Sequence, residues 1–359
     1  MLKKNAMTRK PPTMRQMFLP AIVLLIFLAT ILLPQGEQKT IRLHDDQIEL
    51  QRVTNAITAF IIEEGYGYKI KLVEATIKEA RPLLLRGDID IALEVWVENN
   101  LLWHSQAIGE KLITDLGEMY SGGKQYWIVS KWYAEKHDIE TVFDMKDHWQ
   151  DFLDPDDPSK GLFFNCIYGW TCRDINRVKL QAYDLDKYYN TVSPLSPKSL
   201  KSIYENSQTR KFPIFGYYWE PNSIMEQKSW KILKEPPFSR ETWIDVIEAT
   251  STQNGTRLEN ACSFNDSGAH KIVNSNLANK APAIFKMLKK MKIDIVFFNE
   301  MFLNNEILED NKLSPRQLAL RYLKDYPEKW GLWVPPKVQK KVIKALQDYD
   351  PVETLGEKS

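Results

Sequence analysis

The sequence predicts an α/β protein of two lobes with a cleft between them. Residues 41–96 alternate short apolar strand patterns with amphipathic helix patterns, in the β-α-β-α-β order that is typical of a parallel sheet. A second pattern of strand, loop and helix follows at residues 161–185 and indicates a second sheet. The chain has 359 residues, of which 43% are hydrophobic, so it can form two domains with separate cores.

The first lobe is expected to begin with three strands joined by two helices. Apolar residues alternate or run together in the strands and share one face in the helices. We expect strands at residues 41–43, 69–73 and 89–95 and helices at residues 50–61 and 77–86. Ligands of parallel sheets gather beyond the carboxyl ends of the strands. His44 and Trp96 follow two of these strands and are therefore candidate ligand-binding residues.

The second lobe is expected to begin after Gly122-Gly123, and the polar residues 250–255 mark the expected crossing back to the first lobe. In this lobe we expect strands at residues 125–130, 161–165 and 212–218, a return strand at 243–249, and a helix at 197–206 that is capped by Ser196. The expected divisions of the chain are an N-terminal segment at 1–36, the first lobe at 37–122, the second lobe at 123–250, and the rest of the first lobe with C-terminal helices at 251–359.

The N-terminal segment has a basic beginning and an almost wholly apolar run at residues 17–33, which Pro34 ends. This run is longer than the usual signal-peptide core of roughly 7–15 residues and lies at the short limit of a spanning helix. No convincing cleavage site follows, so a signal peptide and an anchor in the inner membrane are both open. The basic flank is expected to stay in the cytoplasm. Both alternatives therefore place the body outside the cytoplasm.

Charge and motif content exclude several classes of protein. The net charge is +1, but residues 1–36 carry basic residues and no acid, so the body is mildly acidic. It lacks the basic stripe that nucleic-acid binding needs, and no nucleic-acid partner is expected. The histidines show no metal spacing and no phosphate-binding glycine loop is present, so we expect neither a metal nor another cofactor. No nucleophile has a base with an orienting third group, so we do not expect an enzyme.

Two of the three cysteines, Cys166 and Cys172, bracket the pair Gly169-Trp170. In the oxidising compartment that the N-terminal segment implies, they can form a disulfide. The alternative is that both are small buried apolar residues. Cys262 is left over and is expected to be a buried free thiol.

Trp96, Trp170 and Trp219 each follow an apolar run and come from separate segments. Convergent indoles can surround a quaternary ammonium, which has no N–H to donate and is held by cation–π attraction. The backbone amides of Thr171 and Cys172 open a helix, and a helix N-terminus favours an anion. Core packing is the alternative for each tryptophan. The combination predicts a ligand that carries both charges.

Three motifs carry a resemblance to a known family. They are the cysteine pair around Gly169-Trp170, the run Gly87-Asp88-Ile89-Asp90 that leads to Glu94-Val95-Trp96, and the run Phe215-Gly216-Tyr217-Tyr218-Trp219-Glu220-Pro221. Together they resemble the periplasmic glycine betaine/proline betaine-binding proteins of ABC importers, over most of the chain after residue 40. The resemblance implies a type II periplasmic-binding-protein fold and a periplasmic location. It also implies capture of glycine betaine or a related quaternary-ammonium or sulfonium zwitterion, closure on this ligand, and docking on an ABC permease that a separate ATPase drives.

The resemblance also implies roles for further residues. In the family, amides after the central tryptophan hold the ligand carboxylate, and here these belong to Thr171 and Cys172. A histidine four residues after the first tryptophan assists in some members, but this position is Asn100. Asn100 itself or His104 is the candidate to replace that histidine. Tyr217 and Tyr218 are candidates for the wall of the site.

Two other functions remain open. The apolar N-terminal run is compatible with a membrane-tethered ligand sensor of the same fold. An exported enzyme that acts on choline-like compounds is the third alternative.

Overall fold

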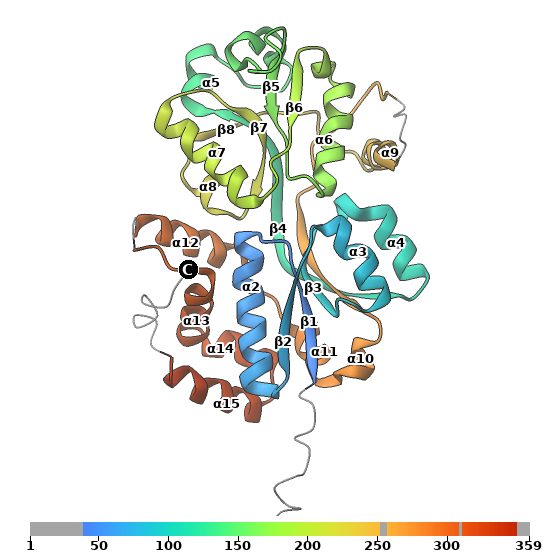
Figure 1. The fold of residues 1–359 in the computed structure, drawn as a ribbon, viewed down its shortest axis with the longest axis vertical. Coiled ribbons are helices and arrows are strands. Elements are labelled where there is room, and N and C mark those ends of the chain that lie inside the picture. The colour runs from blue at the N-terminus through green and yellow to red at the C-terminus, as the bar shows by residue number, and fades with distance from the viewer. Residues whose placement is uncertain (1–38, 252–256, 309–310, 350–359) are drawn as a thin grey trace, which may run out of the picture. The chain divides into compact units, whose positions relative to one another are not determined.

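The computed structural model describes residues 39–251, 257–308 and 311–349. Over these residues, nine strands form one continuous sheet in the order β2-β1-β3-β9-β4-β7-β5-β6, with β8 also paired to β4 (Figure 1). The strands are β1 (Thr40–Asp45), β2 (Lys69–Glu74), β3 (Ile91–Val95), β4 (Ile113–Ser130), β5 (Gly161–Phe164), β6 (Tyr189–Val192), β7 (Phe215–Glu220), β8 (Trp230–Ile232) and β9 (Ser267–Asn274).

Helices flank this sheet. They are α2 (Glu49–Phe60), α3 (Ile77–Arg86), α4 (Leu101–Gly109), α5 (Lys131–His137), α6 (Thr171–Ala182), α7 (Pro197–Arg210), α8 (Ser223–Glu226), α9 (Arg240–Ser251), α10 (Leu277–Lys280), α11 (Pro282–Lys290), α12 (Ile295–Ile307), α13 (Pro315–Asp325), α14 (Pro327–Trp330) and α15 (Pro336–Gln347). The expected signal peptide or anchor at residues 1–36 lies outside the described residues. Among the residues that are described, no helix combines the length and apolar character needed to cross a membrane.

One strand, β4, passes through both halves of the sheet. Its first part pairs with β9 up to Gly123, and its second part pairs with β7 from Lys124 onward. We call the part built on β1, β2, β3 and β9 lobe 1, and the part built on β5, β6, β7 and β8 lobe 2. The register between β4 and β9 shifts repeatedly between Asp115 and Gly123. The strand that we expected at residues 125–130 is thus the second half of a strand of 18 residues.

Lobe 1 confirms the expected β-α-β-α-β unit. β1 pairs in parallel with β2 and with β3, and Leu43 lies opposite both Leu72 and Ile91. The carboxyl ends of these strands therefore meet at one edge of the sheet. Helix α3 has the predicted bounds and ends at Gly87, whose φ of 76° is the left-handed conformation that favours glycine at a helix end.

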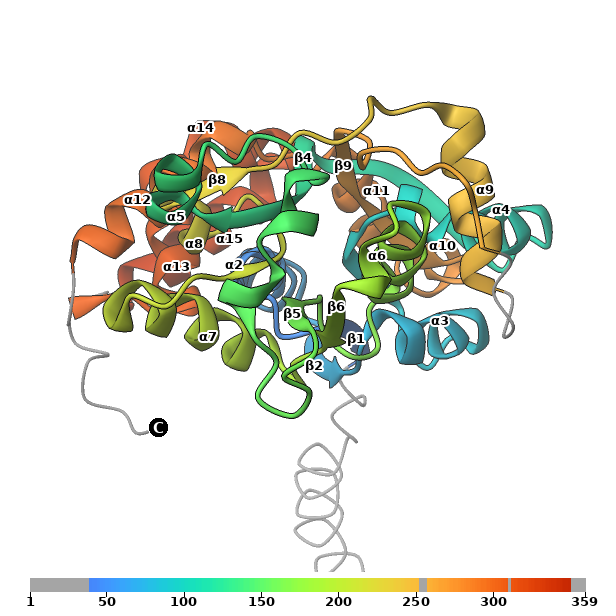
Figure 2. The same cartoon turned by 90° about the horizontal axis from the view of Figure 1, so that it is seen from above.

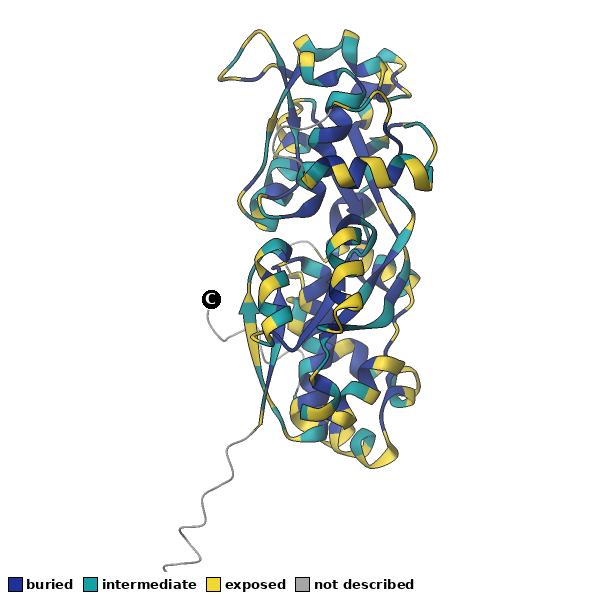
Figure 3. Ribbon diagram, turned by 90° about the vertical axis from the view of Figure 1, so that its right-hand side faces the viewer, coloured by how far each residue is buried: buried dark blue, intermediate teal, exposed yellow. Residues whose placement is uncertain are grey.

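Lobe 2 has an aromatic core and one buried ion pair. Helices α6 and α9 of this lobe lie side by side (Figures 1 and 2). The Trp127 ring packs against Phe163 and Phe215, with ring centroids 4.9 and 5.9 Å apart. Lys179 Nζ, on α6, lies 2.6 Å from Glu235 Oε2, and the two side chains are only 0% and 3% exposed. The buried residues follow the strands and the inner helix faces, whereas the exposed ones lie mainly on outer helix faces and loops (Figure 3).

Two expectations about lobe 2 were wrong. The expected return strand at residues 243–249 is part of helix α9. Trp243, Val246 and Ile247 are buried at the i, i+3 and i+4 spacing of one helix face. The chain returns to lobe 1 through β9 instead. Trp219 also lies within β7 rather than after a strand. Of the polar residues 250–255, the first two end α9, and residues 252–256 lie outside the described residues.

The Lys179–Glu235 pair gives a test of the lobe 2 core. Lys179→Met keeps the side-chain length but leaves the buried Glu235 without its cation, so we expect the free energy of unfolding to fall by about 3–5 kcal/mol. Urea unfolding followed by circular dichroism measures this change. The double variant Lys179→Met/Glu235→Leu removes both charges and should lose less stability than the single variant. A single variant as stable as the wild type would contradict the importance of the pair.

Candidate ligand-binding site

Trp96, Trp170 and Trp219 meet at one cavity between the lobes. Trp96 follows β3 in lobe 1, whereas the other two belong to lobe 2. The Trp170 and Trp219 rings pack edge to face, with centroids 5.3 Å apart at an interplanar angle of 79°. The cavity is lined by Asp46, Ile48, Ile77, Glu94, Trp96, Asn99, Asn100, Gln125, Trp170, Thr171, Cys172, Tyr217 and Trp219. Both lobes therefore contribute aromatic and polar groups.

Local structure holds the two tryptophans of lobe 2 in place. Trp170 is the last residue before α6, in a loop that is closed by a disulfide between Cys166 and Cys172. The predicted disulfide is thus confirmed, and Cys262 is a buried free cysteine as expected. Trp219 stacks on Tyr218, with ring centroids 4.7 Å apart and an angle of 11°. Packing and covalent closure therefore fix both rings of lobe 2.

The N-terminus of α6 is the positive part of the cavity. Its first residue, Thr171, has its Oγ1 2.9 Å from Asn100 Oδ1. Arg81 on α3 donates a hydrogen bond to Asn100 and another, of 2.7 Å, to Thr171 Oγ1. Burial lowers the pKa of Arg81 to about 10, so it stays charged at neutral pH. A buried guanidinium therefore reinforces the helix terminus.

Asn100 does not simply replace a histidine in this arrangement. Its Oδ1 accepts from Arg81, and its Nδ2 donates to the Trp96 backbone carbonyl at 2.7 Å. Both ends of the amide are therefore already used within the protein. Asn100 positions Arg81 and Thr171 beside the cavity.

Two buried carboxyl groups also line the cavity. Asp46 Oδ1 accepts from the Trp170 indole N–H at 2.8 Å, and Asp46 Oδ2 accepts from the Ile77 amide at 3.1 Å. Burial raises the pKa of Asp46 well above its usual value. Glu94 on β3 accepts from the Tyr120 hydroxyl. Burial raises the pKa of Glu94 to about 7, against smaller lowering effects of Tyr120 and of the Trp96 indole.

The other candidates divide into two groups. Tyr217 lines the cavity and donates from its hydroxyl to Gln125 Oε1 at 2.9 Å. His44, His104 and Tyr218 are not among the described residues that line it. His44 is buried, and its Nε2 lies 2.8 Å from the Ala75 carbonyl oxygen. His104 Nε2 lies 3.0 Å from Asp115 Oδ2.

Sequence reasoning missed Asp46, Glu94 and Arg81. Glu94 lies two positions before Trp96, so the alternation of an extended chain predicts that both side chains point to the same side where β3 ends. Asp46 follows the carboxyl end of β1, where ligands of parallel sheets gather. These signals were present. Arg81 gives no comparable signal, because only the tertiary packing of α3 near α6 brings it to Asn100 and Thr171.

Contacts between the lobes surround the cavity. Lys78 on α3 pairs with Asp174 on α6, and the Lys78 amide donates to the Gly169 carbonyl at 3.3 Å. Arg240 on α9 holds Glu98 with hydrogen bonds of 2.6 and 3.0 Å. The lobes are thus in contact on the side of α3 and on the side of α9.

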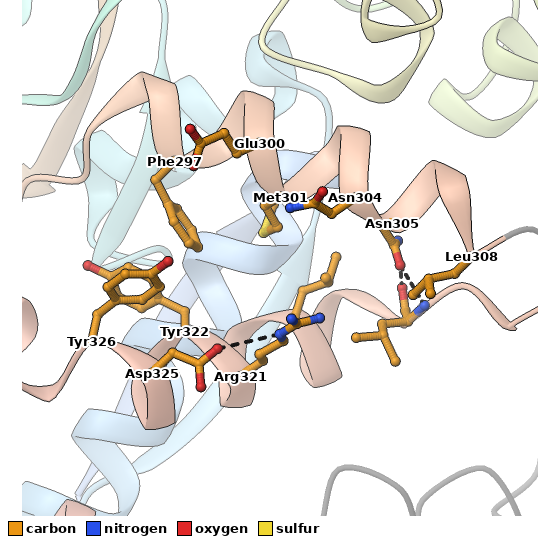
Figure 4. A pocket seen from close by; sticks show the side chains of 12 residues that line it. Phe297, Glu300, Met301, Asn304, Asn305, Leu308, Arg321, Tyr322, Asp325 and Tyr326 are labelled. Carbon is orange, nitrogen blue, oxygen red and sulfur yellow. Dashed lines mark hydrogen bonds and ion pairs between the residues drawn. The ribbon is translucent and has the colours of Figure 1, made fainter.

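A second pocket lies between α12 and α13 and has a different character (Figure 4). Some of its polar groups are paired within the protein. Arg321 Nε lies 3.4 Å from Asp325 Oδ2, and Asn305 exchanges two hydrogen bonds with the Leu313 backbone. No tryptophan is among the described residues that line this pocket, unlike the cavity between the lobes.

Known proteins share this fold. A glycine betaine/proline betaine-binding periplasmic protein of Salmonella typhimurium is 23% identical over 246 residues, which cover 66% of this chain and 71% of the relative. The solved ProX protein of Borrelia burgdorferi, a glycine betaine, L-proline-binding protein, has a TM-score of 0.66 at 16% identity over 85% of this chain and 100% of its own. Lactococcal OpuAC, solved closed with glycine betaine, has a TM-score of 0.63 at 14% identity over 83% of this chain and 100% of its own.

These similarities confirm a mixed α/β fold of the two-lobed periplasmic-binding-protein kind. A family described as the substrate binding domain of ABC-type glycine betaine transport systems matches residues 39–325. The match covers both lobes and every residue that lines the cavity. The chain therefore belongs to the family of substrate-binding domains of ABC-type glycine betaine transport systems.

Proposed function

We propose that this protein binds glycine betaine or a related ammonium zwitterion outside the cytoplasm and delivers it to an ABC permease that a separate ATPase drives. The observation that carries this proposal is the convergence of Trp96, Trp170 and Trp219 from both lobes on one cavity. The family match favours transport over a membrane-tethered sensor and over an exported enzyme that acts on choline-like compounds.

The energetics of such a cage are sufficient. A desolvated cation–π contact contributes about 2 kcal/mol, so three indole faces contribute roughly 6 kcal/mol. A micromolar dissociation constant corresponds to about 8 kcal/mol. Contacts to the ligand carboxylate supply the difference. Binding by the indoles also needs both lobes, because Trp96 and the other two rings lie on different lobes.

The α6 terminus supports the carboxylate end of the proposal. The amides of Thr171 and Cys172 begin the helix, and both residues line the cavity. Arg81 lies behind Thr171 and keeps a positive charge there. Helix amides and a buried guanidinium together favour an anion. Arg81 is our candidate for the charge that the family histidine supplies.

We further propose the type II form of the fold, with lobe boundaries near residues 122 and 250 and a mature chain on the periplasmic side of the inner membrane. The change of partner along β4, from β9 to β7 after Gly123, supports the first boundary. The periplasmic relative supports the location. Residues 1–36 then act as a signal peptide or as an anchor.

The cage can be tested with Trp96→Ala. We expect the affinity for glycine betaine to fall about tenfold or more, because one desolvated cation–π face is lost. Isothermal titration calorimetry on the oxidised full-length protein measures the affinity. Trp132→Ala removes a partly buried tryptophan of α5 outside the cavity and should leave affinity unchanged. Equal affinities of Trp96→Ala and the wild type would argue strongly against the cage.

Closure can be tested at Gly169. Gly169 has a φ of 94°, and a Cβ placed there would lie 2.6 Å from two atoms of Thr76 on the opposite lobe. Gly169→Ala should therefore hold the lobes apart and weaken glycine betaine binding about tenfold, as an overpacking cost of about 1–3 kcal/mol implies.

Gly67→Ala is the matched control for this change. Gly67 also has a positive φ, of 74°, but its Cβ would meet no atom within 4 Å. It adds the same backbone strain without the clash between lobes, so it should lower stability without changing affinity. Thermal unfolding of both variants separates these effects. If both variants bind equally well, contact between Gly169 and Thr76 is not needed for binding.

A further inference from the structure

The Glu94 carboxyl group is the least satisfied polar group of the cavity wall. The residue is 4% exposed. Its Oε1 accepts from Tyr120, whereas its Oε2 is buried and accepts no hydrogen bond of adequate geometry among the described residues, although the Trp96 indole lies close enough to lower the Glu94 pKa. A buried acceptor without a donor costs roughly 1–3 kcal/mol. A buried polar group without a partner calls for an explanation, and in a binding cavity a donor on the ligand is one.

Glu94 is held in place for that role. Tyr120 on β4 donates to it, and the Tyr120 ring packs edge-on against Trp96 and Phe298, with centroids 6.4 and 5.7 Å apart. The oxygen of Glu94 thus lies beside the indole of lobe 1. The other cavity acid, Asp46, already uses both oxygens to accept from Trp170 and Ile77.

A fully methylated ammonium cannot satisfy this oxygen. It has no N–H, so an indole cage alone is sufficient to hold it. A carboxylate acceptor adds a charge-assisted hydrogen bond only where the ligand nitrogen keeps a proton. The unpartnered oxygen therefore matches a cation that presents a donor.

We propose that Glu94 is a specificity-determining residue that accepts a hydrogen bond from the ligand nitrogen. The site then takes zwitterions whose ammonium keeps one N–H, of which N,N-dimethylglycine is the simplest, and not only fully methylated betaines. This inference rests on the proposed function, because it assumes that the ammonium group enters this cavity.

The same arrangement couples binding to a proton. The groups that face Glu94 are the Tyr120 hydroxyl and the Trp96 indole, and Tyr217 lies near Tyr120. With a pKa raised to about 7 by burial, Glu94 is partly protonated in the empty site at neutral pH. A bound cation favours the carboxylate and lowers this pKa. Binding should therefore release a proton near pH 7, and affinity should rise as pH increases toward 7 and level off above it.

The experiment is calorimetric titration of the full-length protein with glycine betaine and with N,N-dimethylglycine. For Glu94→Gln, the affinity ratio of dimethylglycine to betaine should fall about tenfold or more relative to the wild type, which is the loss expected for a charge-assisted hydrogen bond. Titration at pH 7 in two buffers of different ionisation enthalpy should show proton release by the wild type and none by this variant.

Two further variants complete the design. Glu74→Gln changes an exposed acid at the end of β2, which β1 separates from β3, and should alter neither the ratio nor proton release. Tyr120→Phe keeps the Glu94 carboxyl but removes the group that orients it, so it should lower the ratio while proton release persists. Tyr120→Phe therefore tests the inference even if Glu94→Gln does not fold.

The outcomes separate the two proposals. If the folded wild type binds neither compound, the proposed function fails. If it binds betaine and the affinity ratio is the same in Glu94→Gln, or in Tyr120→Phe where that is the variant that folds, the role of Glu94 is overturned and the proposed function stands.

Discussion

The arrangement of the site depends on one hydrogen bond between the lobes. The Trp170 indole N–H of lobe 2 donates to Asp46 at the end of β1 in lobe 1, over 2.8 Å. Both side chains are buried, at 6% and 8% exposure, so leaving either group unpaired there is costly. This bond orients the central indole and requires the lobes to meet. Trp96 and the α6 terminus line a common cavity beside that contact, and Arg81 lies behind Thr171.

Acidic and basic groups of the site come from different elements. Asp46 follows β1 and Glu94 lies on β3, and both line the cavity with the indoles. The positive contribution comes from the α6 terminus and from Arg81, which Asn100 and Thr171 hold by hydrogen bonds. Because hydrogen bonds within the protein hold these side chains, little side-chain reorganisation is needed on binding. A ligand with a single charge satisfies only one part of this wall.

The parallel unit of lobe 1 and the start of α6 could be predicted from the sequence because each depends on a local pattern, whereas Trp219 was expected after a strand and lies within β7. Trp243 was misassigned because a short apolar run is compatible with a strand or with a buried helix, and only its packing decides. Glu94 was overlooked because a single acid within a buried run gives no sign of its missing partner. Arg81 reaches Asn100 and Thr171 through tertiary packing, which no spacing in the sequence encodes.

The strand β4 has a mechanical consequence. One unbroken strand of 18 residues belongs to both lobes, so a bend in β4 changes the orientation of one lobe relative to the other. The pairing of β4 with β9 shifts register between Asp115 and Gly123. These shifts interrupt the hydrogen-bond ladder, so this stretch of β4 bends most easily. Flexing there breaks few hydrogen bonds, and β4 keeps its pairing with β7 beyond Gly123. The stretch between Asp115 and Gly123 is thus the part of β4 that regular pairing holds least.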